Sequence, residues 1–220
     1  MMQMIKACVL TVPVLVAGLL GAGACMVGGT TGSGHVRSEA RNVAGFDSID
    51  LRGEGSLTVR QTGVESLTIA SDDNVLPLVR SDVAGGVLSL GPESTGVVRV
   101  TRLSYTLTVK TLKGISVHGD ASVSAAGIHT PSLAVTMDGD SRVQVAGQAQ
   151  SQDVTINGSG RYDASGLVNR TANVDVNGAG NAVVNVSDRL GTSVNPGAGV
   201  QYIGHPTVTT SGLGRVARRG

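Results

Sequence analysis

Three aspartates in the second half of the chain have the type and spacing that could support chemistry. Asp120 and Asp140 occupy equivalent positions in two similar segments, and Asp138 lies just before Asp140. Carboxylates gathered in this way could bind a hard cation such as Ca²⁺, or act as an acid and base pair. Alternatively they are solvated turn residues, because Asp bonds readily to the backbone in turns. The next segments hold Ser159 and Ala179 at this position, which favours the turn interpretation.

These similar segments belong to a repeat that is marked by a glycine at each corner. The first glycine of each corner lies at 119, 139, 158, 178 and 197, so the spacing between corners is nearly constant. A fixed period of about 20 residues is typical of a solenoid, in which each unit buries its apolar face against the next. His, Asp or Asn comes directly before four of these glycines, as tight corners with left-handed backbone favour.

Apolar and polar residues alternate on both sides of each corner, which predicts strands with one buried face. The inward pairs expected before the corners are Ile115/Val117, Val135/Met137, Val154/Ile156 and Val174/Val176. Those expected after the corners are Val123/Ala125, Val143/Val145, Tyr162/Ala164 and Ala182/Val184. The pattern predicts an all-β fold, a parallel β-helix (solenoid) with about 20 residues per coil. An antiparallel meander or sandwich is the alternative, because Asn-Gly corners also form hairpins.

Composition agrees with the solenoid. The chain has 32 glycines among its 220 residues, and aromatic residues make up only 2%. No helical periodicity persists beyond Ala24, so helix is expected to be nearly absent. The segment 72–86 breaks the repeat, and residues 75–79 are expected to cap the first coil, since solenoid ends need cover.

The segment 1–24 has the features of a secretory signal peptide. Lys6 provides a positive start, and the apolar stretch 7–20 is too short for a comfortable membrane span. Small residues precede Cys25, the only thiol of the mature chain because Cys8 lies within the signal. These features favour lipid attachment at Cys25, with residues 25–42 forming the anchor and a flexible tether. Cleavage by an ordinary signal peptidase without lipidation is the alternative.

The folded part opens with Gly-Phe-Asp-Ser-Ile at 45–49 and continues with Asp-Asp-Asn-Val-Leu-Pro at 72–77 and the later Asn-Gly corners. These segments resemble the bacterial head GIN domain family, over residues 43–208. The resemblance implies a right-handed parallel β-helix in an exported, often lipid-anchored protein that carries an autotransporter-adhesin label. It supplies no catalytic residues. The basic residues 209–220 that follow are predicted to be a disordered tail.

The absence of known catalytic motifs and the balance of charges argue against several classes of function. The sequence contains no nucleophile elbow, zinc-binding helix, phosphate loop or dinucleotide fingerprint, so we expect no catalytic residue and no cofactor. Without Lys6, 16 Lys and Arg residues balance 16 Asp and Glu residues. This balance argues against a nucleic-acid partner, because phosphate recognition needs a positive field.

We therefore interpret the sequence as a non-catalytic, exported cell-envelope solenoid, periplasmic or anchored to the outer membrane through a lipid on Cys25. It would act as an adhesin-like binding or scaffold module for an unknown envelope or surface component. The first alternative is a polysaccharide-active β-helix enzyme, since fold alone does not decide function. Its acid and base candidates would be Asp120, Asp138, Asp140 and Arg142. The second alternative is an envelope sensor or regulatory partner.

Overall fold

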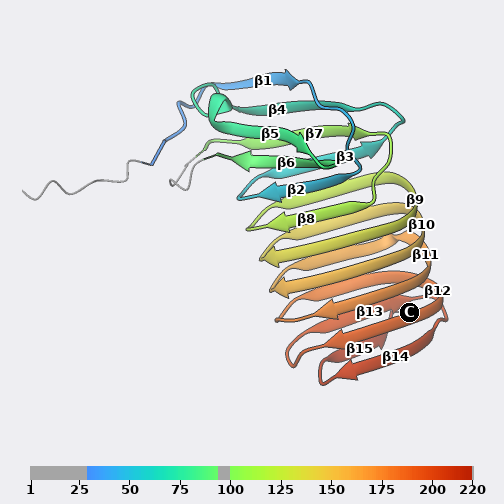
Figure 1. Cartoon of the computed structure of the whole chain (residues 1–220). Helices are drawn as coiled ribbons and strands as arrows, with labels where there is room; N and C mark the ends of the chain where they lie inside the picture. Colours follow the sequence, from blue (N-terminus) through green and yellow to red (C-terminus); the bar gives the residue numbers. More distant parts are fainter. Residues whose placement is uncertain (1–28, 94–99, 220) are drawn as a thin grey trace, which may run out of the picture.

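The computed structural model describes residues 29–93 and 100–219, so the predicted signal peptide and Cys25 lie outside the described residues. Figure 1 shows these residues as a stack of coils, with β1 at one end and β14 and β15 at the other. Within these ranges a single short 3-10 helix, η1, accompanies the strands, which agrees with the expected scarcity of helix. No helix in the described part of the chain has the length and apolar character needed to cross a membrane.

In chain order the elements are β1 (Val36–Arg41), β2 (Ser48–Arg52), β3 (Ser56–Gln61), β4 (Ser66–Asp72), η1 (Leu76–Leu78), β5 (Val79–Ala84), β6 (Val87–Pro92), β7 (Leu103–Val109), β8 (Gly114–His118), β9 (Ser122–Gly139), β10 (Arg142–Gly158), β11 (Arg161–Val176), β12 (Asn181–Val194), β13 (Gly199–Ile203), β14 (Thr207–Gly212) and β15 (Arg215–Arg218). Two faces result from their pairing. Face A contains β3, β7, β13, β15 and the first halves of β9 to β12, and face B contains β2, β6, β8, β14 and the second halves of β9 to β12.

Every pairing from β8 to β15 is parallel, so the predicted solenoid is confirmed and the meander is wrong. Val135 stacks on Ile115 of the preceding coil, and Val154 and Val174 continue this column in the next two coils. Thr192 follows them on β12. The coils differ slightly in length, and they keep a common register by absorbing these differences as shifts near the bends.

The core is a thin stack of aliphatic side chains between the two faces. All sixteen residues predicted to point inward are buried, none more than 3% exposed. Each coil adds the same few β-branched or small residues to the stack, so apolar area is buried mainly between neighbouring coils. This packing explains why so few aromatic residues are used.

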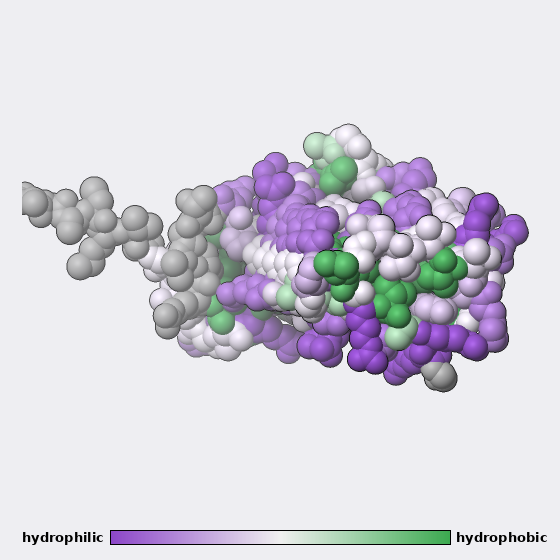
Figure 2. All heavy atoms as spheres, turned by 90° about the horizontal axis from the view of Figure 1, so that it is seen from below, coloured by the Kyte–Doolittle hydropathy of each residue, from purple (hydrophilic) through white to green (hydrophobic). Residues whose placement is uncertain are grey.

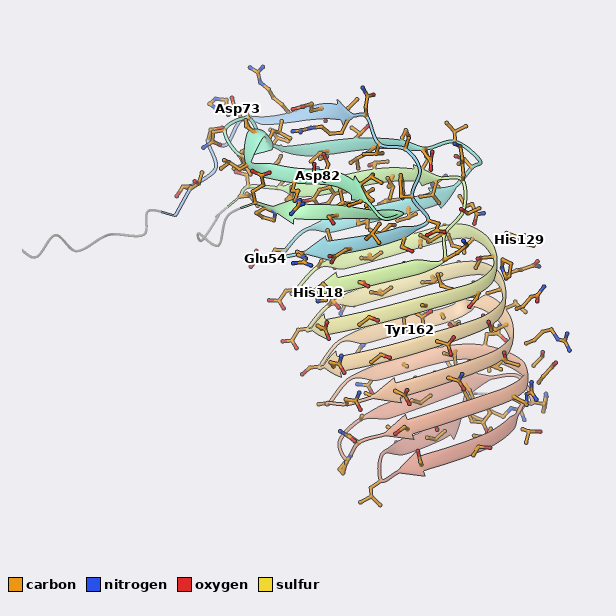
Figure 3. All side chains as sticks on the ribbon, in the orientation of Figure 1. Glu54, Asp73, Asp82, His118, His129 and Tyr162 are labelled. Atoms are coloured by element: carbon orange, nitrogen blue, oxygen red, sulfur yellow. The ribbon has the colours of Figure 1, made fainter. Side chains whose placement is uncertain are left out.

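Three aromatic rings are nevertheless buried in the core, namely Phe46, Tyr105 and Tyr162, and Tyr162 lies within the coils from β9 onward (Figure 3). Its hydroxyl donates a hydrogen bond to Oε1 of Gln152 at 2.9 Å, and both side chains are buried. Burial raises the pKa of Tyr162 well above its ordinary value, since the phenolate would lose its hydration. The pair is thus a neutral polar contact that needs both partners.

The corners between face B and face A depend on glycine for two reasons. Gly139 has a φ of +114°, in the region that favours glycine. A Cβ built on Gly139 would also lie 2.8 Å from the carbonyl oxygen of Gly119, one coil away. The corner backbones of successive coils therefore approach too closely for any side chain.

The N-terminal coils are not stacked in chain order. The coil made of β2 and β3 lies between the β6–β7 coil on one side and the β8–β9 coil on the other. The intervening strands β4 and β5 run antiparallel to β7 and β6. Lys113 Nζ, 2.6 Å from Asp47 Oδ2, ties the start of β2 to the start of β8.

The predicted cap at residues 75–79 packs against the core as expected, with Val75, Leu76 and Val79 buried. The predicted tether at 25–42 is wrong for its last residues, because Val36–Arg41 form β1. Backbone pairing with β4 holds this exposed strand in place without apolar burial. Charged residues on β1 suit an outermost strand, where they discourage pairing with other chains.

The prediction of a disordered tail at 209–220 is also wrong for the described residues. Thr207–Gly212 pairs parallel with β12, and Arg215–Arg218 pairs parallel with β13. Val208 on β14 and Val216 on β15 pack against the core. Both strands therefore still direct an apolar residue inward, although their other residues are mostly polar or basic. Figure 2, viewed toward this end, shows apolar side chains at the surface, and Leu213 is 86% exposed.

We expect Gly139→Ala to destabilise the solenoid by about 1–3 kcal/mol or more, because it adds backbone strain to a clash with the neighbouring coil. Gly63→Ala is the matched control, since Gly63 has a φ of +82° but no atom within 4 Å of a built Cβ. Urea unfolding followed by circular dichroism measures both free energies. Equal losses for the two variants would show that close coil packing adds nothing.

We expect Tyr162→Phe to lower the free energy of unfolding by about 1–3 kcal/mol, because Gln152 Oε1 is left buried without its donor. Tyr202→Phe serves as the control, since Tyr202 is only half-buried and lies in the last coil. The same urea titration measures both variants. A loss for Tyr162→Phe no larger than that for Tyr202→Phe would contradict this account of the polar pair.

Candidate functional site

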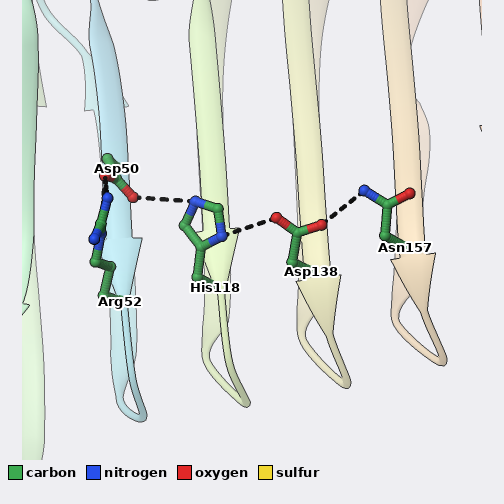
Figure 4. Close-up of polar contacts among 5 residues, drawn as sticks. All are labelled: Asp50, Arg52, His118, Asp138 and Asn157. Atoms are coloured by element: carbon green, nitrogen blue, oxygen red, sulfur yellow. Dashed lines mark hydrogen bonds and ion pairs between the residues drawn. The ribbon is translucent and has the colours of Figure 1, made fainter. Parts of the chain in front are cut away.

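A ladder of polar side chains crosses the coils just before the glycine corners (Figure 4). The rungs come from four face B strands, with Asp50 and Arg52 on β2, His118 on β8, Asp138 on β9 and Asn157 on β10. His118 Nδ1 lies 2.8 Å from Asp138 Oδ2, and His118 Nε2 lies 3.4 Å from Asp50 Oδ1. Asn157 Nδ2 donates to Asp138 Oδ1 at 2.7 Å, and Asn177 Nδ2 donates to Asn157 Oδ1 at 3.1 Å.

Most polar atoms of this ladder bind one another, although Asp50 Oδ1 is buried without a hydrogen-bond partner and lies 3.4 Å from His118 Nε2. Arg52 Nε and Nη2 both donate to Asp50 Oδ2, at 3.0 and 2.8 Å. Both carboxylate oxygens of Asp138 are occupied, by His118 and by Asn157. The ladder therefore fixes the side chains of adjacent corners, as stacked polar residues of neighbouring strands do.

The three candidate aspartates lie apart in their roles rather than in one ligand cluster. Asp120 and Asp140 are exposed at the corners, while Asp138 belongs to the ladder. Among the described residues, no group of three or more His, Cys, Asp or Glu side chains is arranged to hold a metal ion. Arg142, the fourth member of the alternative acid and base set, is exposed on β10.

Three adjoining hollows form a second feature at the opposite bend, where face A turns into face B. The first and second have volumes of about 390 and 540 Å³ and share Pro131, Gln150 and Arg170. The second and third share Thr171 and Arg189, and the third has a volume of about 370 Å³. Together they make one groove that crosses the coils from β9 to β14, which we call the side groove.

The first hollow of the side groove contains apolar side chains, and the second contains charged ones. Val168, 52% exposed, lies in the first hollow with Ala149 and Pro131. In the second hollow Arg170 donates from Nε to Asp188 Oδ2 at 3.0 Å. The hydroxyl of Ser187 and the guanidinium of Arg170 hold the pKa of Asp188 below its ordinary value by hydrogen bonding.

The groove lining presents polar groups beside an apolar patch, and its carboxylate Asp188 has a lowered pKa. A glycosidase acid needs a carboxyl whose pKa is raised, so that it carries a proton near neutral pH. Each carboxylate in the described ranges whose pKa departs from its ordinary value is lowered, including Asp188 in the groove. Amide, hydroxyl and guanidinium groups beside apolar patches are typical of binding surfaces.

Sequence reasoning missed both Asp50 and the side groove. Asp50 lies far before His118 in the sequence, and only the unusual coil order makes them neighbours. The groove residues lie at bends, where strand alternation breaks and no longer tells which side chains point outward. An apolar residue in such a bend, such as Val168, was the available signal.

We expect millimolar CaCl₂ to leave the thermal unfolding midpoint unchanged, because Asp138 is already engaged and no three-ligand cluster accompanies it in the described ranges. Differential scanning calorimetry with and without calcium measures the midpoint. A calcium-dependent rise that disappears in the double variant Asp120→Asn and Asp140→Asn would restore the cation site.

Comparisons with known proteins agree with the coil architecture. A protein from Bacteroides fragilis, described as a putative adhesin, has a TM-score of 0.72 at 22% identity, over 87% of this chain and 100% of its own. A putative lipid binding protein from Parabacteroides distasonis has a TM-score of 0.55 at 17% identity, with coverage of 88% and 100%. A putative adhesin from the same species gives 0.52 at 20% identity, with coverage of 87% and 100%.

At these identities the three structures show the fold alone. No curated protein matches the chain. The family model described as "Putative auto-transporter adhesin, head GIN domain" matches residues 45–206, which include the strands from β2 to β13. The match extends over most of the coils described above, and the chain belongs to the head GIN domain family.

Proposed function

We propose that the chain is a non-catalytic, adhesin-like binding module that holds an extended partner along its side groove. The continuity of the groove from β9 to β14 carries this proposal, because an extended polymer can contact several coils at once. The description of the family as an auto-transporter adhesin supports the same role. The partner is an envelope or surface component.

The proposal includes export through the signal peptide at 1–24 and lipid attachment at Cys25, in the periplasm or at the outer membrane. The first described residues are bound to the cap, where Asn74 Nδ2 donates to the carbonyl of Thr31 at 2.9 Å. Ser33 N donates in turn to Asn74 Oδ1 at 2.9 Å. An anchor upstream of Thr31 would hold the solenoid by its capped end, so that the later coils extend away from the membrane.

We expect Val168→Asp to weaken binding to the native envelope at least about ten-fold, because it places a charge in the apolar part of the groove. Val64→Asp is the matched control, since Val64 is 63% exposed in the turn between β3 and β4. Binding of the immobilised protein to envelope fractions of the source bacterium, measured by surface plasmon resonance, compares the variants. Equal binding by wild type and Val168→Asp would refute the groove as the site.

The enzyme alternative is tested on the same preparations. The purified protein is incubated with acidic and neutral polysaccharides, and new reducing ends or unsaturated products are measured. Binding without turnover is the expected result. Turnover that Asp140→Asn abolishes would overturn the non-catalytic proposal.

A further inference from the structure

A basic hollow opens on face A, close to the end formed by β15. Its volume is about 480 Å³, and it lies across β11, β12, β13 and β15. The register places Arg161, Asn181, Gly199 and Arg215 in one column of neighbouring strands. Gly199 has no side chain between Asn181 and Arg215, and this gap helps to form the hollow.

Three arginines line this hollow: Arg161, Arg215 and Arg219. None of them has a carboxylate within 4.0 Å among the described residues, whereas Arg52, Arg80 and Arg170 elsewhere form ion pairs. The backbone N–H of Arg219 donates to the carbonyl of Tyr202 at 2.8 Å, which fixes the chain after β15 beside the hollow. Three guanidinium groups therefore line one hollow without a carboxylate within 4.0 Å in the described part of the protein, although the charge of Arg219 acts on Asp163.

Asp163 is the one carboxylate among the described residues that lines the hollow, and Ser165 binds one of its two oxygens. Its Oδ1 accepts hydrogen bonds from the backbone N–H of Ser165 at 3.0 Å and from the Ser165 hydroxyl at 2.6 Å. These bonds lower the pKa of Asp163, so it is ionised at neutral pH and offsets one of the three positive charges. The hollow keeps an excess of two positive charges.

The sequence around the hollow is also rich in positive charge. Between 161 and 219 the chain has six arginines and three aspartates, with no Lys or Glu. The balanced charge of the whole chain therefore conceals a basic C-terminal part. Guanidinium groups bind carboxylate and sulfate oxygens through paired hydrogen bonds, and the amides of Asn181 and Gln201 in the same hollow can bind hydroxyl groups.

We propose that this hollow, which we call the arginine pocket, binds the carboxylate or sulfate groups of an acidic polysaccharide. Strands lie about 4.8 Å apart, so Arg161 and Arg215, three strands apart, are separated by roughly 14 Å along the stack. Basic groups at this separation match anions repeated along a polymer better than a single small anion. The pocket is separate from the side groove and is a second binding site.

The test uses the protein with all residues that follow the predicted signal peptide. The probes are two acidic polysaccharides, dextran sulfate and polygalacturonate, and neutral dextran is the uncharged comparison. The double variant Arg161→Gln and Arg215→Gln is expected to lose about a hundred-fold in affinity, or about ten-fold for each arginine. Arg60→Gln with Arg102→Gln removes the same charge at exposed positions outside the pocket and is the matched control. Isothermal titration calorimetry measures affinity, and circular dichroism confirms that each variant is folded.

Wild-type affinity for dextran sulfate should fall as NaCl rises, because the contacts are ionic. Equal affinity losses in the two double variants would overturn the pocket and indicate non-specific charge attraction. Binding to anionic phospholipid vesicles, duplex DNA or inorganic phosphate in place of the acidic polymers would also overturn the proposal. Val168→Asp should bind dextran sulfate like the wild type, so failure of the groove and failure of the pocket can be told apart.

Discussion

Close approach of backbone on backbone at the glycine corners is the constraint on which the solenoid depends. The corner carbonyl of one coil faces the corner α-carbon of the next, from Gly53 to Gly119 and on through Gly139, Gly158 and Gly178. Because no side chain fits there, the coils keep the spacing of adjacent β-strands and pair in parallel register. Inward residues then stack on inward residues, and outward residues form columns along the molecule.

Both proposed binding sites follow from these outward columns. The side groove collects side chains from successive bends, and the arginine pocket collects them from neighbouring columns on face A. The ladder of Asp50, His118, Asp138 and Asn157 has the same origin, but both carboxylate oxygens of Asp138 are engaged by other members of the ladder. In the arginine pocket the outward side chains of Arg161 and Arg215 have no carboxylate within 4.0 Å in the described part of the protein, whereas Arg170 in the side groove is paired with Asp188.

The sequence was most informative about the repeating part of the fold. Strict alternation identified the inward residues correctly, and the spacing of the glycines identified parallel coils. The alternation of apolar and polar residues is hard to recognise in a strand that has only one or two apolar residues. For this reason most of β14 and all of β15, which follow residue 206, were predicted to be disordered. The hollows were unpredictable because they arise from residues in several coils and from a small residue such as Gly199.

The position of β2 and β3 has a consequence for how the chain is assembled. This coil is the first of the regular ones in the sequence, yet both of its open edges are covered by strands that are synthesised later. Until the chain beyond His118 emerges, one edge remains without its neighbour, and contacts across such separations form slowly. A chain made from its N-terminus therefore cannot complete the surroundings of this coil before β8 and β9 have been made.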